Sequence, residues 1–352
     1  MTIRRKIEDC TNEVLSVLEL DSWILELLML PIICGGHVVI QGMIGTGKSV
    51  CIMALAKIMD MESGMYQCHP DTMPGDLIGF EIFDQETRKF KIRQGPVLKC
   101  NMFLVDEINR MSPRSQAALL GPMAQGIVTI GDSDGLKVPK PFVVYATMNP
   151  IESQGVYPLS EAQVDRFMFQ IPFPYHSYNG IAKILSYANA DSTQQKIMGL
   201  KKILAKNEII DAQEKVNNIP LGDAKKWITA IYLSSCPMGS QDGRAPEGWK
   251  SPPETDSCVQ YGPSPRALRD FAQAARGLVY LREKSIEWDD VAKLAIPVLR
   301  HRIIMKRQFP EEYRHKYKKG HASERVDTFI KSAVEAASDR WENLPDFTTT
   351  SG

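Results

Sequence analysis

The segment Gly42-Met43-Ile44-Gly45-Thr46-Gly47-Lys48-Ser49 constrains the fold of this chain more than any other feature of its sequence. It fits the pattern G-x-x-x-x-G-K-[ST], in which glycines let backbone amides wrap a polyphosphate. An apolar run at 37–41 precedes the motif, and a helical stretch at 50–59 follows it. This context predicts a phosphate-binding loop between a strand and a helix. Lys48 is expected to reach the phosphates, Ser49 to bind Mg²⁺, and the helix to direct its positive end at the anion.

The pattern of apolar residues predicts an α/β domain followed by a helical one. Buried-strand patterns at 102–105 and 142–146 alternate with helical stretches, the first of them at 3–32, which is typical of a mainly parallel sheet. After about residue 174 the strand signal fades, and helical patterns follow at 178–189, 194–206, 208–216, 221–234, 265–284, 287–307 and 322–339. We therefore expect N-terminal helices and an α/β domain over 1–174, an all-helical domain over 175–340, and a disordered tail at 341–352.

Turn-forming residues interrupt both parts. Residues 80–94 alternate around a turn-like centre, and the Asp-Ser-Asp-Gly segment at 132–135 lies between apolar flanks, so each predicts a hairpin. Residues 236–264 are rich in Gly, Pro and Ser, which predicts a long surface loop.

Polar residues end two of the predicted strands, where ligands bind in open α/β sheets. Asp106 and Glu107 follow the strand at 102–105, and Asn149 follows the strand at 142–147. Downstream of a phosphate loop, Asp106 is expected to hold Mg²⁺ and Glu107 to orient and polarise an attacking water. The Asn149 amide is expected to contact the γ-phosphate and the water together.

Two arginines lie in predicted helices, Arg166 in a short one that begins at 161 and Arg266 in the first turn of the one at 265–284. Ser264-Pro265 reads as an N-cap followed by proline, which places Arg266 where a cation opposes the helix dipole. A capping box that begins at Ser160 starts the helix of Arg166. A bound anion would relieve the repulsion at Arg266, and pairing with a nearby carboxylate is the alternative for both arginines.

Together these motifs resemble the MoxR family of AAA+ ATPases over about residues 30–310. The resemblance rests on the phosphate loop and on the segments 105–110 (VDEINR), 146–150 (ATMNP), 157–167 (YPLSEAQVDRF), 264–266 (SPR) and 299–302 (LRHR). It implies an AAA+ P-loop domain and a helical lid, with a helix-2 insert at about 76–95 and a pre-sensor hairpin at about 127–140 that face the centre of a ring. It also implies that Arg166 is an arginine finger for the neighbouring subunit's ATP and that Arg266 senses the γ-phosphate.

The residues and the resemblance together define a candidate site. Glu107, Asn149, Arg166 and Arg266 are expected to be catalytic, and Ser49 and Asp106 to hold Mg²⁺. The residues expected to bind ATP are Gly42, Gly45, Thr46, Gly47, Lys48, Ser49, Val50 and Asp106.

Composition and charge indicate a cytoplasmic protein. The longest apolar stretch, 23–34, is too short for a membrane span of about 20 residues. The charged start of the chain lacks the apolar core of an export signal. Seven scattered cysteines without a C-x-x-C pair are typical of a reducing compartment.

The resemblance favours a hexameric ATPase that remodels or activates a protein client, typically one with a von Willebrand factor A domain. Two alternatives share the architecture, a nucleic-acid motor and the motor subunit of a metal chelatase. Lys+Arg and Asp+Glu number 42 each, which argues against a chain that binds nucleic acid through its overall charge. Residues 300–319 nevertheless hold eight Lys/Arg against two Glu, so a local basic patch is present.

Overall fold

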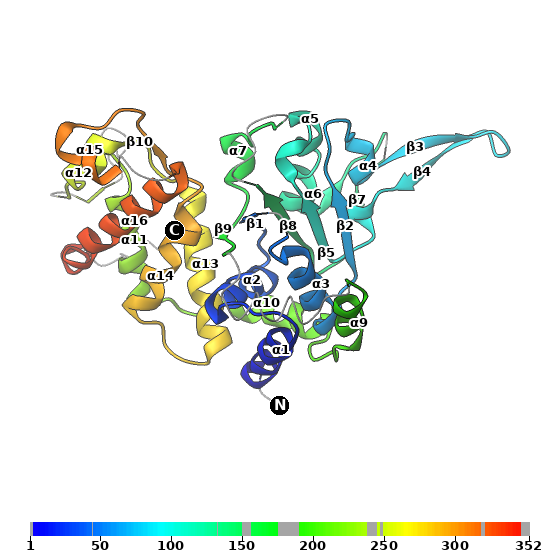
Figure 1. Cartoon of the computed structure of the whole chain (residues 1–352), viewed down its shortest axis with the longest axis horizontal. Coiled ribbons are helices and arrows are strands. Elements are labelled where there is room, and N and C mark those ends of the chain that lie inside the picture. The colour runs from blue at the N-terminus through cyan, green and yellow to red at the C-terminus, as the bar shows by residue number, and fades with distance from the viewer. Residues whose placement is uncertain are drawn as a thin grey trace, which may run out of the picture. The chain divides into compact units, whose positions relative to one another are not determined.

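The computed structural model describes residues 3–43, 45–131, 133–149, 156–174, 190–237, 245–246, 249–317 and 321–345. The chain divides into two compact units, 1–217 and 218–352, which are described separately below. Figure 1 labels their helices and strands. In the described part of the chain, no helix combines the length and the apolarity needed to cross a bilayer.

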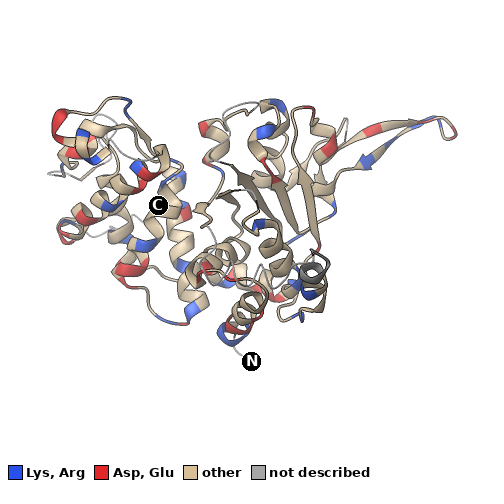
Figure 2. Cartoon of the chain, in the orientation of Figure 1, with Lys and Arg blue, Asp and Glu red and all other residues tan. Residues whose placement is uncertain are grey.

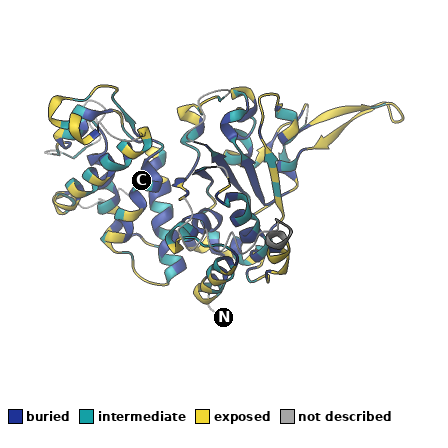
Figure 3. Ribbon diagram, viewed as in Figure 1, coloured by how far each residue is buried: buried dark blue, intermediate teal, exposed yellow. Residues whose placement is uncertain are grey.

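A five-stranded parallel sheet forms the centre of the first unit. Its order is β2 (Ser63–Gln67), β5 (Met102–Asp106), β8 (Val143–Met148), β1 (Val38–Gln41) and β9 (Phe169–Pro172). The three middle strands are buried along almost their whole length, as Figure 3 shows, because helices cover a parallel sheet on both faces. These three are the strands that the sequence predicted, and β2 and β9 add the two edges.

Nine described helices belong to this unit. They are α1 (Ile3–Val17), α2 (Ser22–Cys34), α3 (Lys48–Ile58), α4 (Pro74–Ile78), α5 (Pro113–Ala117), α6 (Leu120–Gln125), α7 (Glu161–Val164), α9 (Ala190–Gly199) and α10 (Lys206–Asn217), with 3-10 turns η1 (Pro96–Leu98) and η2 (Ile108–Arg110). The helical stretch expected at 3–32 is two helices, because the Asp21 side chain caps α2 by accepting from the Trp23 N–H at 2.8 Å.

Two antiparallel hairpins lie where the sequence indicates turns. Strands β3 (Gly79–Asp84) and β4 (Lys89–Gln94) form a ribbon that extends away from the sheet (Figure 1), and β6 (Ile127–Val128) pairs with β7 (Leu136–Lys137). At the base of the ribbon, Gly79 has φ +106°, and a Cβ there would lie 2.3 Å from the Arg93 carbonyl oxygen. Only glycine fits this crossing of the two strands.

The second unit is mainly helical, which agrees with the predicted fold class. Its elements are α11 (Ala224–Ser234), α12 (Pro253–Cys258), β10 (Val259–Tyr261), α13 (Pro265–Arg282), α14 (Trp288–Leu299), β11 (Ile304–Met305), α15 (Glu311–Tyr317), α16 (Ala322–Ser338) and the 3-10 turn η4 (Trp341–Asn343). Helix α11 packs on α13, α14 and α16, and the Trp227 ring meets Trp288 and Trp341 edge to face.

Two details of this unit correct the sequence analysis. The antiparallel pair β10–β11 makes it not wholly helical, and the helix expected at 287–307 ends at Leu299 so that β11 can form. The segment 236–264 is not all surface loop, because α12 and β10 occupy 253–261 and bury Thr255 and Cys258. The helix expected at 178–189 lies outside the described residues.

The division of the chain falls at 217/218, whereas the sequence analysis placed it at 174/175. The reason is packing: α10 contacts α2, and α9 contacts α3 and α1, so both helices belong to the first compact unit. Amphipathic helices carry no sequence mark of the unit on which their apolar face packs.

Candidate functional site

The phosphate-loop motif connects the buried strand β1 to helix α3. Gly45 and Gly47 have φ of +81° and +83°, a conformation that side chains rarely adopt, and α3 begins at Lys48. The Gly42 N–H donates to the Met148 carbonyl at 3.1 Å, which ties the start of the loop to the end of β8. The local sequence therefore builds a glycine-dependent turn directly in front of a helix N-terminus, as an anion-binding loop requires.

Lys48 is 8% exposed and lies within this loop. Its Nζ donates to the carbonyl oxygens of Gly42 and Met43 at 3.0 and 2.6 Å, and the Thr46 hydroxyl donates to the Met43 carbonyl at 2.9 Å. Burial lowers the pKa of Lys48, while the carboxylates of Asp106 and Glu107 act in the opposite direction. The ammonium is therefore held against loop carbonyls in a site with two carboxylates nearby.

Thr147 organises the acidic pair at the ends of β5 and β8. Its hydroxyl donates to Asp106 Oδ1 at 2.5 Å and accepts from the Glu107 N–H at 2.8 Å. Thr147 is 1% exposed, so water contributes little to these bonds. One side chain thus links both acidic residues to the neighbouring strand.

Glu107 leaves the strand in a left-handed conformation, with φ 56° and ψ 51°. It is one of the described non-glycine residues with positive φ, which are uncommon and concentrate at functional sites. The turn η2 follows directly, and Arg110 Nε pairs with Glu107 Oε2 at 2.9 Å.

These elements surround a cavity of about 480 Å³. All of the residues that the sequence analysis assigned to ATP binding line it, as do Glu107 and Asn149. Gln67, Arg110, Thr147 and Met148 also line it. The sequence analysis did not assign these four residues to the site. Gln67 and Thr147 lie at strand ends and Arg110 lies three residues after Glu107, so the carboxyl-end rule and the helical spacing are the signals that could have found them.

The lining fits a nucleotide with its metal. A buried ammonium and the start of a helix offer positive charge to phosphate, and a hydroxyl and a carboxylate at Ser49 and Asp106 offer oxygen ligands. Among the described residues, no cluster of three or more His, Cys, Asp or Glu is arranged to hold a metal ion. Proteins hold Mg²⁺ through one or two carboxylates together with the phosphates of the substrate, and Asp106 offers one such carboxylate.

The two arginines expected to be catalytic come from other parts of the chain. Arg166 follows α7, and its Nη1 donates to the Leu120 carbonyl at 3.0 Å. Its buried Nε has no hydrogen-bond partner among the described residues. Arg166 does not line the 480 Å³ cavity.

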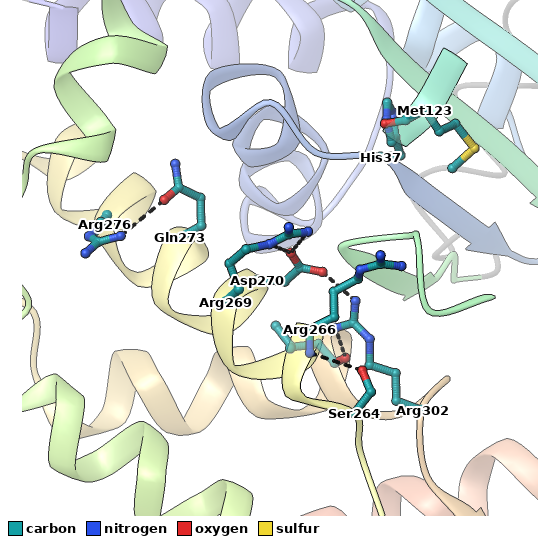
Figure 4. A network of polar contacts seen from close by, with 10 residues as sticks. His37, Met123, Ser264, Arg266, Arg269, Asp270, Gln273, Arg276 and Arg302 are labelled. Atoms are coloured by element: carbon teal, nitrogen blue, oxygen red, sulfur yellow. Dashed lines mark hydrogen bonds and ion pairs between the residues drawn. The ribbon is translucent and has the colours of Figure 1, made fainter. Parts of the chain in front are cut away.

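Arg266 belongs to the second unit, in the first turn of α13, where its N–H donates to the capping Ser264 hydroxyl at 3.2 Å. Figure 4 shows the charged network beside it, in which Asp270 accepts from Arg302 Nη2 at 2.5 Å and contacts Arg269 at 3.4 Å. The Arg302 side chain is 1% exposed. Burial raises the pKa of Asp270, and the two guanidiniums oppose that effect.

Comparisons with known proteins show which families of domains this architecture belongs to. The ATPase family associated with various cellular activities (AAA) matches residues 37–169, and the AAA lid domain matches residues 254–319. A crystal structure of a candidate ATPase from Cytophaga hutchinsonii is 29% identical, with a TM-score of 0.77 and 94% of each chain covered. The fold is therefore that of an AAA domain followed by its lid domain.

Relatives with similar sequences identify the family within the AAA+ ATPases. The uncharacterized protein YeaC of Bacillus subtilis is 34% identical over 79% of this chain and 81% of its own length. Chaperone MoxR1 of Mycobacterium tuberculosis is 32% identical over 85% of this chain and 76% of its own length. Protein MoxR of Paracoccus denitrificans is 26% identical over 80% of this chain and 83% of its own length. The chain belongs to the MoxR family of AAA+ ATPases.

Proposed function

We propose that this protein binds ATP with Mg²⁺ in the 480 Å³ cavity and hydrolyses it to ADP and phosphate. The observation that carries the proposal is the convergence of three chain segments on one cavity: the glycine loop before α3, the acidic pair after β5 and Asn149 after β8. Each segment supplies one part of an ATPase site, namely phosphate binding, metal and water handling, and a polar contact for the γ-phosphate.

In this proposal Lys48 and the loop amides hold the phosphates, and Ser49 and Asp106 hold Mg²⁺. Bound Mg²⁺ neutralises charge that develops on the phosphate oxygens. Glu107 orients and polarises the attacking water, and Asn149 contacts both the γ-phosphate and that water. The two hydrogen bonds of the Thr147 hydroxyl support this assignment, because they hold the Glu107 backbone and the Asp106 carboxylate against the end of β8.

We further propose that the protein works as a ring, a hexamer, in which Arg166 reaches the ATP of the neighbouring subunit. Arg166 supports this idea because it does not line the cavity of its own chain and its buried Nε lacks a partner among the described residues. An anion from a second copy would satisfy that N–H. Arg266, in the lid, is proposed to report the γ-phosphate.

The proposed output is remodelling or activation of a protein partner, one with a von Willebrand factor A domain. The chaperone name of the mycobacterial relative supports a protein client. The β3–β4 hairpin supports it as well, because its Phe80, Phe83 and Phe90 are 44%, 51% and 67% exposed. Large exposed apolar side chains that gather on one element are typical of protein contacts.

The chemistry is tested by measuring ATP binding and turnover in two variants. Lys48→Ala should lose ATP binding, because the phosphates lose their main countercharge. Glu107→Gln should retain binding and lose turnover, because only the water contact changes. Normal turnover by Glu107→Gln would remove the proposed role of this residue.

The ring is tested by mixing variants. Arg166→Ala should bind ATP and hydrolyse it poorly. Adding the Lys48→Ala protein should restore part of the turnover, because mixed interfaces join an intact cavity to an intact arginine. An active protein that stays monomeric with ATP bound would contradict the ring.

The client is tested with the Glu107→Gln protein as an ATP-bound trap, followed by turnover assays of the wild-type protein with whatever the trap captures. A captured protein that raises turnover supports the proposal. Stimulation of turnover by DNA that disappears in high salt, without any captured protein, would favour the nucleic-acid motor.

A further inference from the structure

An ion pair inside the cavity engages the residue that is proposed to handle the attacking water. Arg110 Nε lies 2.9 Å from Glu107 Oε2, and the two side chains are 38% and 13% exposed. Both residues line the cavity. One of the two carboxylate oxygens of Glu107 is therefore engaged by a guanidinium in this structure.

The backbone around this pair is fixed by buried contacts. The Glu107 N–H donates to the Thr147 hydroxyl at 2.8 Å, and the Arg110 N–H donates to the Glu107 carbonyl at 2.8 Å. Gln116, which is 2% exposed, donates from Nε2 to the carbonyls of Ile108 and Met111 at 3.3 and 3.1 Å. These contacts hold the 3-10 turn that starts directly after Glu107 and ends at Arg110. The backbone on both sides of the ion pair is therefore fixed.

A guanidinium and a water molecule compete for the same carboxylate. While Arg110 holds Oε2, the charge that Glu107 offers to a water proton is partly neutralised and its rotamer is restricted. We propose that Arg110 is a positioning residue that restrains Glu107, so that basal ATP turnover is lower than the site allows. This inference rests on the proposed function, since it concerns the same hydrolysis.

The size of the restraint follows from the exposure of the pair. Ion pairs that are partly open to water are worth up to ~1 kcal/mol, which corresponds to about a fivefold population of the paired form. Loss of the guanidinium should therefore raise the available fraction of Glu107, and with it kcat, by about fivefold. The KM for ATP should stay unchanged, because the phosphate loop and Lys48 hold the phosphates.

The experiment measures kcat and KM for ATP in the wild-type protein and in Arg110→Gln, Arg110→Lys and Arg114→Gln. Arg110→Gln removes the charge and should raise kcat about fivefold. Arg110→Lys retains a cation in the cavity and should stay close to the wild type. Arg114 is an exposed arginine one turn further along, on α5 and outside the cavity lining, so Arg114→Gln is the matched control and should not change kcat.

A second comparison shows whether the effect acts through Glu107. In the Glu107→Gln background, adding Arg110→Gln should give no gain in turnover. Should Arg110→Gln fail to fold, as judged by thermal unfolding, Arg110→Met retains the apolar stem and replaces it. A rise in kcat at constant KM is not an effect that simple destabilisation produces.

The outcomes separate this inference from the proposed function. A kcat that falls or stays unchanged in Arg110→Gln, while the wild type hydrolyses ATP and Glu107→Gln does not, overturns the restraint alone. A fall would mean that Arg110 orients Glu107 productively. Turnover in Glu107→Gln equal to that of the wild type would overturn the role of Glu107, and the restraint with it.

Discussion

Replacing Thr147 by valine tests the bridge that joins the acidic pair to β8. Valine has nearly the same shape as threonine, so the strand and its packing should survive and only the hydroxyl is lost. The hydroxyl makes two bonds, one to Asp106 Oδ1 at 2.5 Å and one from the Glu107 N–H at 2.8 Å. The substitution therefore leaves a carboxylate with one donor fewer and a backbone N–H without its acceptor.

The cost can be worked from these two bonds. A hydrogen bond to a charged group contributes ~1.5–3 kcal/mol, and a buried N–H left without a partner costs ~1–3 kcal/mol. Because Asp106 faces an open cavity, water recovers part of the first term, and we expect a loss of about 3 kcal/mol in the free energy of unfolding of the first unit. For a unit of this size, that corresponds to a melting temperature lower by about 6–12 °C.

The assay is urea unfolding followed by circular dichroism, together with ATP turnover. Thr147→Val should lower the urea midpoint and reduce kcat by about tenfold or more, because Glu107 and Asp106 lose their common anchor. Thr147→Ser retains the hydroxyl and should lie close to the wild type in both measurements. A valine variant with the wild-type midpoint and the wild-type kcat would refute the role of the bridge.

Three further predictions concern other parts of the chain. Burial lowers the pKa of His37 to about 4, whereas an unfolded histidine titrates near 6.5. Its contribution to stability is therefore complete above pH 6.5, and up to about 3 kcal/mol is lost as the pH falls toward 4. Urea midpoints should show this loss in the wild type and much less of it in His37→Gln. Arg302→Met leaves the buried Asp270 with the exposed Arg269 as its one ion-pair partner among the described residues, so it should lower the free energy of unfolding of the second unit by about 3 kcal/mol, measured by tryptophan fluorescence. Replacing Phe83 and Phe90 by serine should leave basal turnover unchanged and abolish stimulation by a protein client, and a client response equal to that of the wild type would contradict the proposed contact.

The sequence predicted the centre of the sheet because strands buried on both faces read as continuous apolar runs. The edge strands do not read this way. In β2 the exposed and half-buried residues alternate around Gly64, and in β9 Gln170 and the final Pro172 interrupt the apolar run. Neither strand therefore shows the continuous apolar run of a strand buried on both faces.

The candidate site could be predicted where its residues form a recognisable motif or follow a buried strand. The phosphate loop, the acidic pair and the asparagine meet one of these conditions. Thr147 was missed because its hydroxyl acts through Asp106 and Glu107, and a threonine in a strand is ordinary. Arg110 was missed because its partner became evident only when η2 placed the two side chains on the same side.

The β3–β4 ribbon has a further consequence. Figure 2 shows that both charge signs occur along it, and nearly all of its residues are exposed, so in the part of the chain that the structure describes no second layer covers either face. Two-stranded ribbons without a covering layer are marginally stable on their own, and their backbone amides open without unfolding of the rest. Amide hydrogens of 80–93 should therefore exchange with solvent far sooner than those of β5 and β8. Slower exchange in this segment alone would then report that a partner has bound there, before the identity of that partner is known.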